Sequence, residues 1–210
     1  MSEVMAWTEA ERLSLAELLA DLDEHEWSVD SLCAGWTVRE VAAHLTMSTR
    51  LTLGLAIRGA IRSGGSFDRM ENRFARERAV RFTPAELIAQ IRETASSPRR
   101  APGAKPLDPL LDALVHGQDI ARPLGRQRAV PDEPALAALE HARTSAFYGA
   151  RRRFRGLRLV ATDADWAAGD GVEEVRGSVS DLLLLATGRP AGLAGTSGPG
   201  ADRLAAQLKV

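Results

Sequence analysis

The clearest indication of the fold is the sequence LDPLLDALVHGQDIARPLG at residues 107–125. Four polar residues recur along it at helical spacing: Asp108, Asp112, His116 and Asp119. At about 100° per residue they form one narrow stripe between apolar neighbours, and no lysine or arginine precedes Arg122 in the stretch. A solvent-facing helix normally carries mixed charges over a broad arc. The stripe is therefore predicted to face the interior, where its charges need a partner from elsewhere in the chain.

Asp112 and His116 are four residues apart, so both side chains point the same way and reach one ion. A second histidine, His44, belongs to a predicted helix that begins with the capping box of Thr37 and Glu40 and places this histidine on its core-facing edge. Two imidazoles and one carboxylate from two helices form a divalent-metal site with open positions, for zinc, nickel or iron. His44, Asp112 and His116 are therefore the candidate ligands.

The sequence also allows other roles for the residues of this stripe and for His44. Asp119 or Asp108 either replaces Asp112 as a ligand or orients an imidazole from behind. Without a metal, His44 is a satisfied core histidine, and the stripe is a buried ion-pair network closed by Arg50 or Arg39.

Composition indicates an ordinary globular protein of 210 residues, with 45% hydrophobic and 26% charged residues. The formal net charge of −1 gives no global field that recruits nucleic acid or an anionic membrane. A single cysteine, Cys33, excludes an intrachain disulfide and is expected to be a buried apolar residue. The first residues lack a signal-peptide pattern, and no run of about 18 apolar residues occurs. We expect a cytoplasmic protein with no nucleic-acid or membrane partner.

Hydrophobic periodicity predicts helices over most of the first 155 residues. A capping box of Thr8 and Glu11 is expected to start the first one, and Trp27 and Trp36 are expected to seal one end of the bundle. From Gly156 onward, short β-prone runs predict two strands around a turn, followed by an apolar helix that stops at Gly188 and by a terminal helix. The predicted fold is α+β and mainly α, with a helical domain at 1–155 that carries the metal site and a small α/β domain at 156–210. The helices are expected at 8–24, 37–62, 67–80, 83–95, 107–122, 134–154, 178–187 and 200–210.

Three motifs in order carry a family resemblance: GWTVREVAAHL at 35–45, LVHGQDIARPLG at 114–125 and VRGSVSDLLLLATGRPAGLAG at 175–195. Together they resemble the mycothiol-dependent maleylpyruvate isomerase family, a branch of the DinB-like metal-binding four-helix bundles. In that family a histidine of the second helix and a Glu-x-x-x-His pair of a later helix bind a divalent metal, usually zinc. These positions correspond to His44, Asp112 and His116. The chain departs from the pattern at Asp112, whose side chain is one methylene shorter than glutamate.

The resemblance implies a DinB-like four-helix bundle followed by a small α/β segment. It also implies an enzyme, an isomerase or an S-transferase, in which the metal lowers the pKa of the mycothiol thiol so that the thiolate attacks a small electrophile. The implied cofactors are a divalent metal, zinc before nickel or iron, and mycothiol as the thiol cosubstrate, in a monomer or homodimer. The alternative, motivated by the shorter Asp112, is a non-catalytic metal-binding or regulatory protein with a degenerate site.

Overall fold

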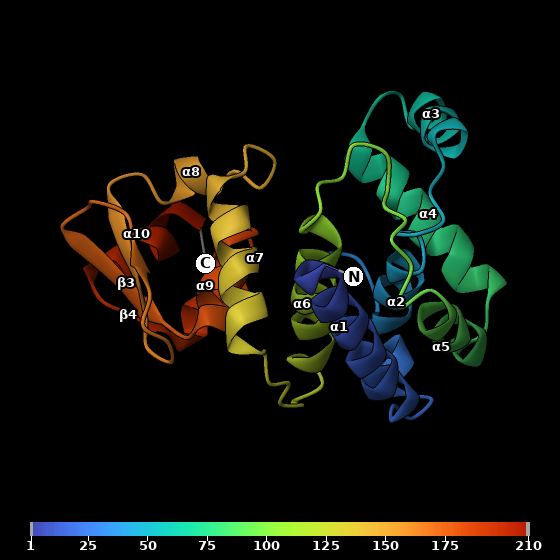
Figure 1. Ribbon diagram of the computed structural model, residues 1–210, viewed down its shortest axis with the longest axis horizontal. Coiled ribbons are helices and arrows are strands. Elements are labelled where there is room, and N and C mark those ends of the chain that lie inside the picture. The colour runs from blue at the N-terminus through green and yellow to red at the C-terminus, as the bar shows by residue number, and fades with distance from the viewer. Residues whose placement is uncertain (1, 209–210) are drawn as a thin grey trace. The chain divides into compact units, whose positions relative to one another are not determined.

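The computed structural model describes residues 2–208 and divides into two compact units, one ending at Arg128 and the other beginning at Ala129. The first unit is helical and is drawn from blue to green in Figure 1. Its elements are α1 (Glu3–Ala20), the 3-10 turn η1 (Glu26–Ser28), α2 (Val38–Leu45), α3 (Leu53–Arg62), α4 (Phe67–Arg81), α5 (Pro84–Glu93) and α6 (Asp108–Ala121).

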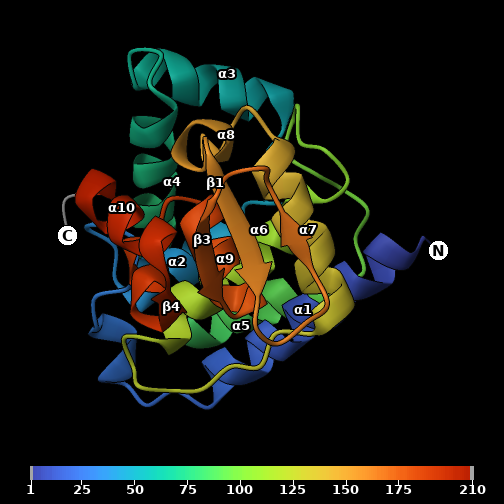
Figure 2. The same ribbon diagram turned by 90° about the vertical axis from the view of Figure 1, so that its left-hand side faces the viewer.

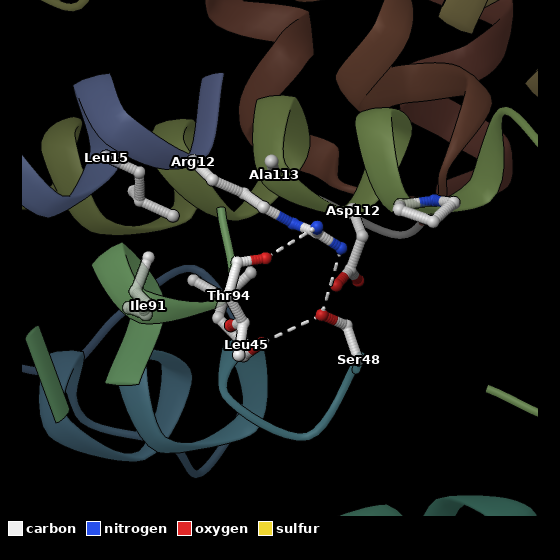
Figure 3. Close-up of a pocket in the computed structure, with 9 residues that line it drawn as sticks. Arg12, Leu15, Leu45, Ser48, Ile91, Thr94, Asp112 and Ala113 are labelled. Carbon is white, nitrogen blue, oxygen red and sulfur yellow. Dashed lines mark hydrogen bonds between the residues drawn. The ribbon is translucent and has the colours of Figure 1, made fainter. Parts of the chain in front are cut away.

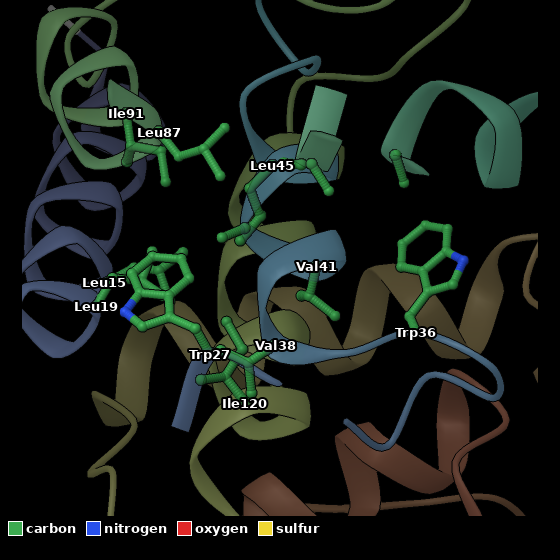
Figure 4. Close-up of a cluster of buried hydrophobic side chains, with 14 of the residues drawn as sticks. Leu15, Leu19, Trp27, Trp36, Val38, Val41, Leu45, Leu87, Ile91 and Ile120 are labelled. Carbon is green, nitrogen blue, oxygen red and sulfur yellow. The ribbon is translucent and has the colours of Figure 1, made fainter. Parts of the chain in front are cut away.

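The core of the first unit forms around the short helix α2, which packs against α4, α5 and α6, while α1 packs against α5 and α6. Their buried faces meet in one apolar cluster (Figure 4) that includes Leu15, Leu19, Val41, Leu87 and Ile120. Every one of these five side chains is fully or almost fully removed from solvent, so burial of their apolar surface is the main stabilising term of the unit. The same packing brings the end of α2 against α6.

Both tryptophans of the 21–37 connection are buried, and they occupy separate places in the apolar cluster (Figure 4). Trp27 lies beside Leu15 and Leu19, and Trp36 lies on the other side of Val41 (Figure 4). The separation follows from the chain path, because η1 holds Trp27 whereas Trp36 lies just before α2.

The capping box predicted at Thr37 and Glu40 is confirmed. The carboxylate of Glu40 accepts the backbone N–H of Thr37 at 2.7 Å, and the corresponding pair before α5 closes the same way. The box predicted at Thr8 is wrong, because α1 already begins at Glu3 and the Thr8 hydroxyl donates to the Val4 carbonyl inside the helix. A threonine within a helix can bond back to its own turn as readily as it caps a new one.

The single helix predicted over 37–62 is wrong, because it is broken between Leu45 and Leu53. The break contains two side chains that bond back onto the preceding turn: the Thr46 hydroxyl donates to Ala43 at 2.6 Å and Ser48 to Leu45 at 3.1 Å. Such local bonds compete with helix continuation. As a result His44 lies in the last turn of the short helix α2 and not near the start of a long helix.

The second unit combines helices with a four-stranded sheet of order β2-β1-β3-β4 (Figure 2). β1 and β3 are parallel and in register from Leu157 with Glu173, and the two outer pairings are antiparallel. α9 packs against β1 and β3 and also against α7. The elements are α7 (Asp132–Thr144), α8 (Ala150–Arg153), β1 (Leu157–Ala161), β2 (Ala167–Ala168), β3 (Glu173–Gly177), α9 (Val179–Ala186), η2 (Pro190–Gly195), β4 (Thr196–Ser197) and α10 (Pro199–Leu208).

The division between the compact units falls earlier than the domain boundary expected after residue 155. The helix expected over 134–154 ends at Thr144, and a new turn starts after Gly149, which has a φ of 69°. Because α7 packs on α9, both α7 and α8 group with the sheet. Apolar spacing shows that a helix has a buried face, but it does not show against which neighbour that face packs.

Within residues 2–208, no helix combines the length and the apolarity that crossing a membrane requires.

Candidate metal centre

The three predicted ligands meet where the end of α2 packs on α6. Asp112 Oδ1 lies 3.5 Å from Nε2 of His44 and 3.3 Å from Nε2 of His116. One nitrogen or oxygen atom from each of the three side chains lies within 4.8 Å of the others. The structure therefore places the two imidazole Nε2 atoms and one carboxylate oxygen around a common point.

Each imidazole is held from behind by a second carboxylate. Nδ1 of His44 lies 3.0 Å from Oε2 of Glu71 on α4, and Nδ1 of His116 lies 2.9 Å from Oδ2 of Asp119. A carboxylate at Nδ1 favours the tautomer that carries its proton there, which leaves the Nε2 lone pair free for a cation. Both rings are therefore oriented, and both Nε2 atoms face Asp112.

The spacing of the ligand atoms fits a small divalent cation. Bonds of about 2.0–2.1 Å in tetrahedral geometry place neighbouring ligand atoms about 3.4 Å apart, and the two separations from Asp112 Oδ1 are 3.3 and 3.5 Å. A strong N–H···O hydrogen bond is shorter, about 2.7–3.2 Å. The shorter side chain of Asp112 therefore reaches both imidazoles at the distances that a metal centre requires.

The centre is walled on one side by an aromatic ring and open at its carboxylate. The Trp36 ring lies 5.2 Å from the His44 ring, centroid to centroid, and its indole N–H donates to Asn72 at 2.6 Å. The side chains of His44, His116 and Asp112 keep 18%, 10% and 29% of their surface exposed. Asp112 is therefore the most exposed of the three candidate ligands.

Electrostatic interactions favour the protonated form of both histidines and the ionised form of Asp112. Burial raises the pKa of Asp112, but the charge and hydrogen bonding of His116 and His44 outweigh it and hold that pKa well below its usual range. Burial lowers the pKa of His116, but Cys33, Asp112 and Asp119 raise it well above its ordinary value. The pKa of His44 is also raised, because Asp112 and Glu71 outweigh the effect of burial. The cluster holds protons firmly, and a divalent cation would have to displace them.

A second group of potential ligands, also within residues 2–208, shares one histidine with the first. The Cys33 thiol donates to Asp119 Oδ2 at 3.1 Å, and its sulfur lies 3.6 Å from Nδ1 of His116. The expectation that Cys33 is simply a buried apolar residue is wrong, because it is only partly buried and contacts a fully buried carboxylate. Its position behind His116 places it on the side of the ring that faces away from Asp112.

Arg50 and Arg39, the alternative partners predicted for the acidic stripe, bind other groups. Arg50 contacts Glu93 and the backbone of Gln90, and Arg39 donates to the carbonyl of Phe82. Asp108 accepts the backbone N–H of Lys105 at 2.7 Å, at the start of α6. Of the two further acids in the stripe, Asp119 is the one that orients an imidazole.

Glu71 is the site residue that sequence reasoning missed. It lies on α4, whose charged sequence predicted a helix but no functional face. A signal was present, since Glu71 precedes Ala75 and Ala79 by one and two turns, and both alanines are buried. An acid on a stripe that is otherwise buried indicates a partner in the interior.

The comparison with protein families adds an independent observation. The model of the mycothiol maleylpyruvate isomerase N-terminal domain matches residues 8–130, more than half of the chain. The chain belongs to the mycothiol maleylpyruvate isomerase family. That matched range contains the three candidate ligands and also Glu71 and Asp119.

Solved structures agree with this family at the level of the fold. A crystal structure of the mycothiol-dependent maleylpyruvate isomerase and one of its histidine-to-alanine variant each align with a TM-score of 0.57. Each alignment covers 96% of this chain and 97% of the other at 17% sequence identity. The predicted fold, mainly α with a DinB-like bundle and a small α/β part, is confirmed. No curated protein matched the sequence.

Proposed function

We propose that this protein is a metal-dependent enzyme that uses mycothiol to isomerise a small electrophile or to transfer a thiol to it. Membership of the mycothiol maleylpyruvate isomerase family supports this activity. The observation that carries the proposal is the convergence of His44, Asp112 and His116, with both Nε2 atoms 3.3–3.5 Å from one carboxylate oxygen.

The donor set of two imidazoles and one carboxylate suits zinc, and nickel or iron would accept the same ligands. A divalent cation held there would supply Lewis acidity that favours the thiolate form of mycothiol. The protein needs no cysteine nucleophile of its own in this scheme. Cys33 lies behind His116, where its sulfur is 3.1 Å from Oδ2 of Asp119 and on the side of the ring away from Asp112.

The remaining residues prepare the site. Glu71 and Asp119 fix the rings of His44 and His116, so the site is oriented before any ligand enters. Trp36 shields the His44 ring, which lowers the local dielectric around the charged groups. Asp112 is the most exposed of the three candidate ligands.

The experiment is an assay with maleylpyruvate and mycothiol on protein purified without chelator, on chelator-treated protein and on treated protein reloaded with zinc. Turnover that depends on mycothiol, disappears with the metal and returns with zinc supports the proposal. Turnover that survives complete metal removal contradicts it. Binding of zinc without turnover of maleylpyruvate or of a general electrophile would instead support the alternative of a non-catalytic metal-binding protein.

A further inference from the structure

A buried arginine lies next to the candidate metal centre. Arg12 on α1 is 6% exposed, and its Nη1 donates to three backbone carbonyls that follow the end of α5. The acceptors are Thr94 at 3.2 Å, Ala95 at 3.1 Å and Ser97 at 3.2 Å. Because the guanidinium is planar and rigid, fixing Nη1 also fixes the direction of Nη2.

The other end of this guanidinium points toward Asp112. Figure 3 shows the group extending from α1 toward the Asp112 carboxylate, with Ser48 beside both. Nη2 lies 3.4 Å from the Ser48 hydroxyl, which itself donates to the carbonyl of Leu45. This long contact leaves Nη2 with a hydrogen to offer, and Asp112 is the acid on the wall that Arg12 faces.

Arg12, Ser48 and Asp112 line one small cavity with a volume of about 10 Å³. A space of that size, with several polar partners, holds about one water molecule. The guanidinium is therefore placed to act on Asp112 through one bridging water. Oδ1 of Asp112 faces the two histidines, which leaves its second oxygen for the arginine.

Charge gives a second reason for the pairing. A buried guanidinium is stable only beside a negative partner, and three neutral carbonyls supply no charge. Burial lowers the pKa of Arg12, and the negative charge of Asp112 opposes that shift. The arginine thus uses the same carboxylate that the two imidazoles approach from the other side.

We propose that Arg12 is a positioning residue of the metal centre, which holds the Asp112 carboxylate so that Oδ1 faces both imidazoles. This inference rests on the proposed metal-dependent function. It gives a reason why an aspartate suffices here, because a short side chain that is anchored from behind loses little order when it binds a cation. Arg12 touches neither thiol nor electrophile in this role.

The test compares Arg12→Gln with Arg128→Gln. Arg128 is a matched control, since its side chain is 8% exposed, it pairs at 2.8 Å with Glu11 on the same helix α1, and its guanidinium crosses Gly117 of α6. Removing it disturbs the packing of the same two helices without touching Asp112. The measurements are the dissociation constant of zinc by competition with a chromophoric chelator and the visible spectrum of the cobalt(II)-substituted proteins.

We expect Arg12→Gln to weaken zinc binding 10–100-fold and to change the cobalt spectrum, as loss of an outer-shell partner does. Arg128→Gln is expected to keep the affinity and spectrum of the wild type even where its melting temperature falls. Arg12→Lys serves if the glutamine variant does not fold, and a smaller loss of affinity is expected because an ammonium cannot hold three carbonyls and a carboxylate in one plane.

Unchanged or tighter zinc binding in the Arg12 variants overturns the positioning role and leaves the proposed function standing. An equal loss in the Arg12 and Arg128 variants also overturns it, because the effect then comes from helix packing alone. A wild-type protein that binds no zinc overturns the metal-dependent function itself, and this role of Arg12 with it.

Discussion

His116 Nδ1 lies 2.9 Å from Oδ2 of Asp119, a carboxylate that is completely buried one turn further along α6. This contact turns the Nε2 atom of His116 toward Asp112 and fixes the tautomer that a metal needs. Because of this contact, His116 presents its Nε2 atom to Asp112 in a fixed orientation.

Asp119→Asn tests this contact with little change in shape. We expect zinc binding to weaken 10–100-fold, because a neutral amide holds the imidazole proton less firmly than a carboxylate does. Competition with a chromophoric chelator measures the affinity. Asp108→Asn is the matched control on the same helix, since Asp108 faces the backbone of Lys105, and its zinc affinity should equal that of the wild type. Equal affinities in both variants would show that Asp119 has no orienting role.

Glu71 makes the equivalent contact behind the other histidine. Glu71→Gln is expected to weaken zinc binding about 10-fold or more, whereas Glu77→Gln, at an exposed position of the same helix, should have no effect. The same chelator competition checks both. If Glu71→Gln binds zinc as the wild type does, the ring of His44 is held by its packing against Trp36 and not by the carboxylate.

The raised pKa values of His44 and His116 make the stability of the metal-free protein dependent on pH. A group whose pKa is raised on folding contributes stability below its unfolded pKa, about 6.5 for histidine, and loses that contribution as the pH rises through the folded pKa. The lowered pKa of Asp112 acts in the opposite direction, and its contribution disappears only at acidic pH below about 4. The metal-free protein should therefore become less stable as the pH rises above about 6.5 and through the raised pKa values of the two histidines.

Zinc should reverse this trend, since it binds neutral imidazoles and competes with protons. The difference in melting temperature between zinc-loaded and chelator-treated protein is expected to widen as the pH rises from 6 to 8. Thermal unfolding at several pH values measures it. A difference that stays constant over this range would mean that zinc does not bind through these histidines.

Cys33→Ala should preserve zinc binding and thiol-dependent turnover. The thiol contacts Asp119 from the side away from Asp112, and the contact of Asp119 with His116 remains when the thiol is removed. We expect a loss of about 1 kcal/mol in the free energy of unfolding from one missing hydrogen bond, measured by urea denaturation. Complete loss of turnover with zinc still bound would instead identify Cys33 as a nucleophile.

The sequence predicted that the three candidate ligands lie together, but it predicted their surroundings less well. Asp112 and His116 share a helix, so periodicity alone places them together, and the capping box at Thr37 fixes where α2 begins and which face His44 occupies. The carboxylates behind the two histidine rings were not equally predictable. Asp119 could be proposed because it lies on the same stripe, whereas Glu71 comes from a separate helix, and no local pattern indicates which helices pack together.

Local sequence patterns also failed to predict the helix break after Leu45 and the residue at which the helical unit ends. The sequence pattern places Thr46 and Ser48 inside a helix. Their hydroxyls instead donate to backbone carbonyls of the preceding turn, where α2 ends. Residues 132–144 have an amphipathic helix pattern, but that pattern does not show that α7 packs on α9. Arg12 was likewise unpredictable, since its partners are carbonyls more than 80 residues away in the chain.

Titration of chelator-treated protein with zinc by isothermal calorimetry tests most directly whether His44, Asp112 and His116 hold one divalent cation, with His44→Ala and Asp112→Ala as the comparison proteins. We expect one zinc per chain for the wild type and an affinity weaker by about 100-fold or more in each variant. A wild-type protein that binds no zinc, or variants that bind it as tightly as the wild type, would show that these three residues do not form a metal site.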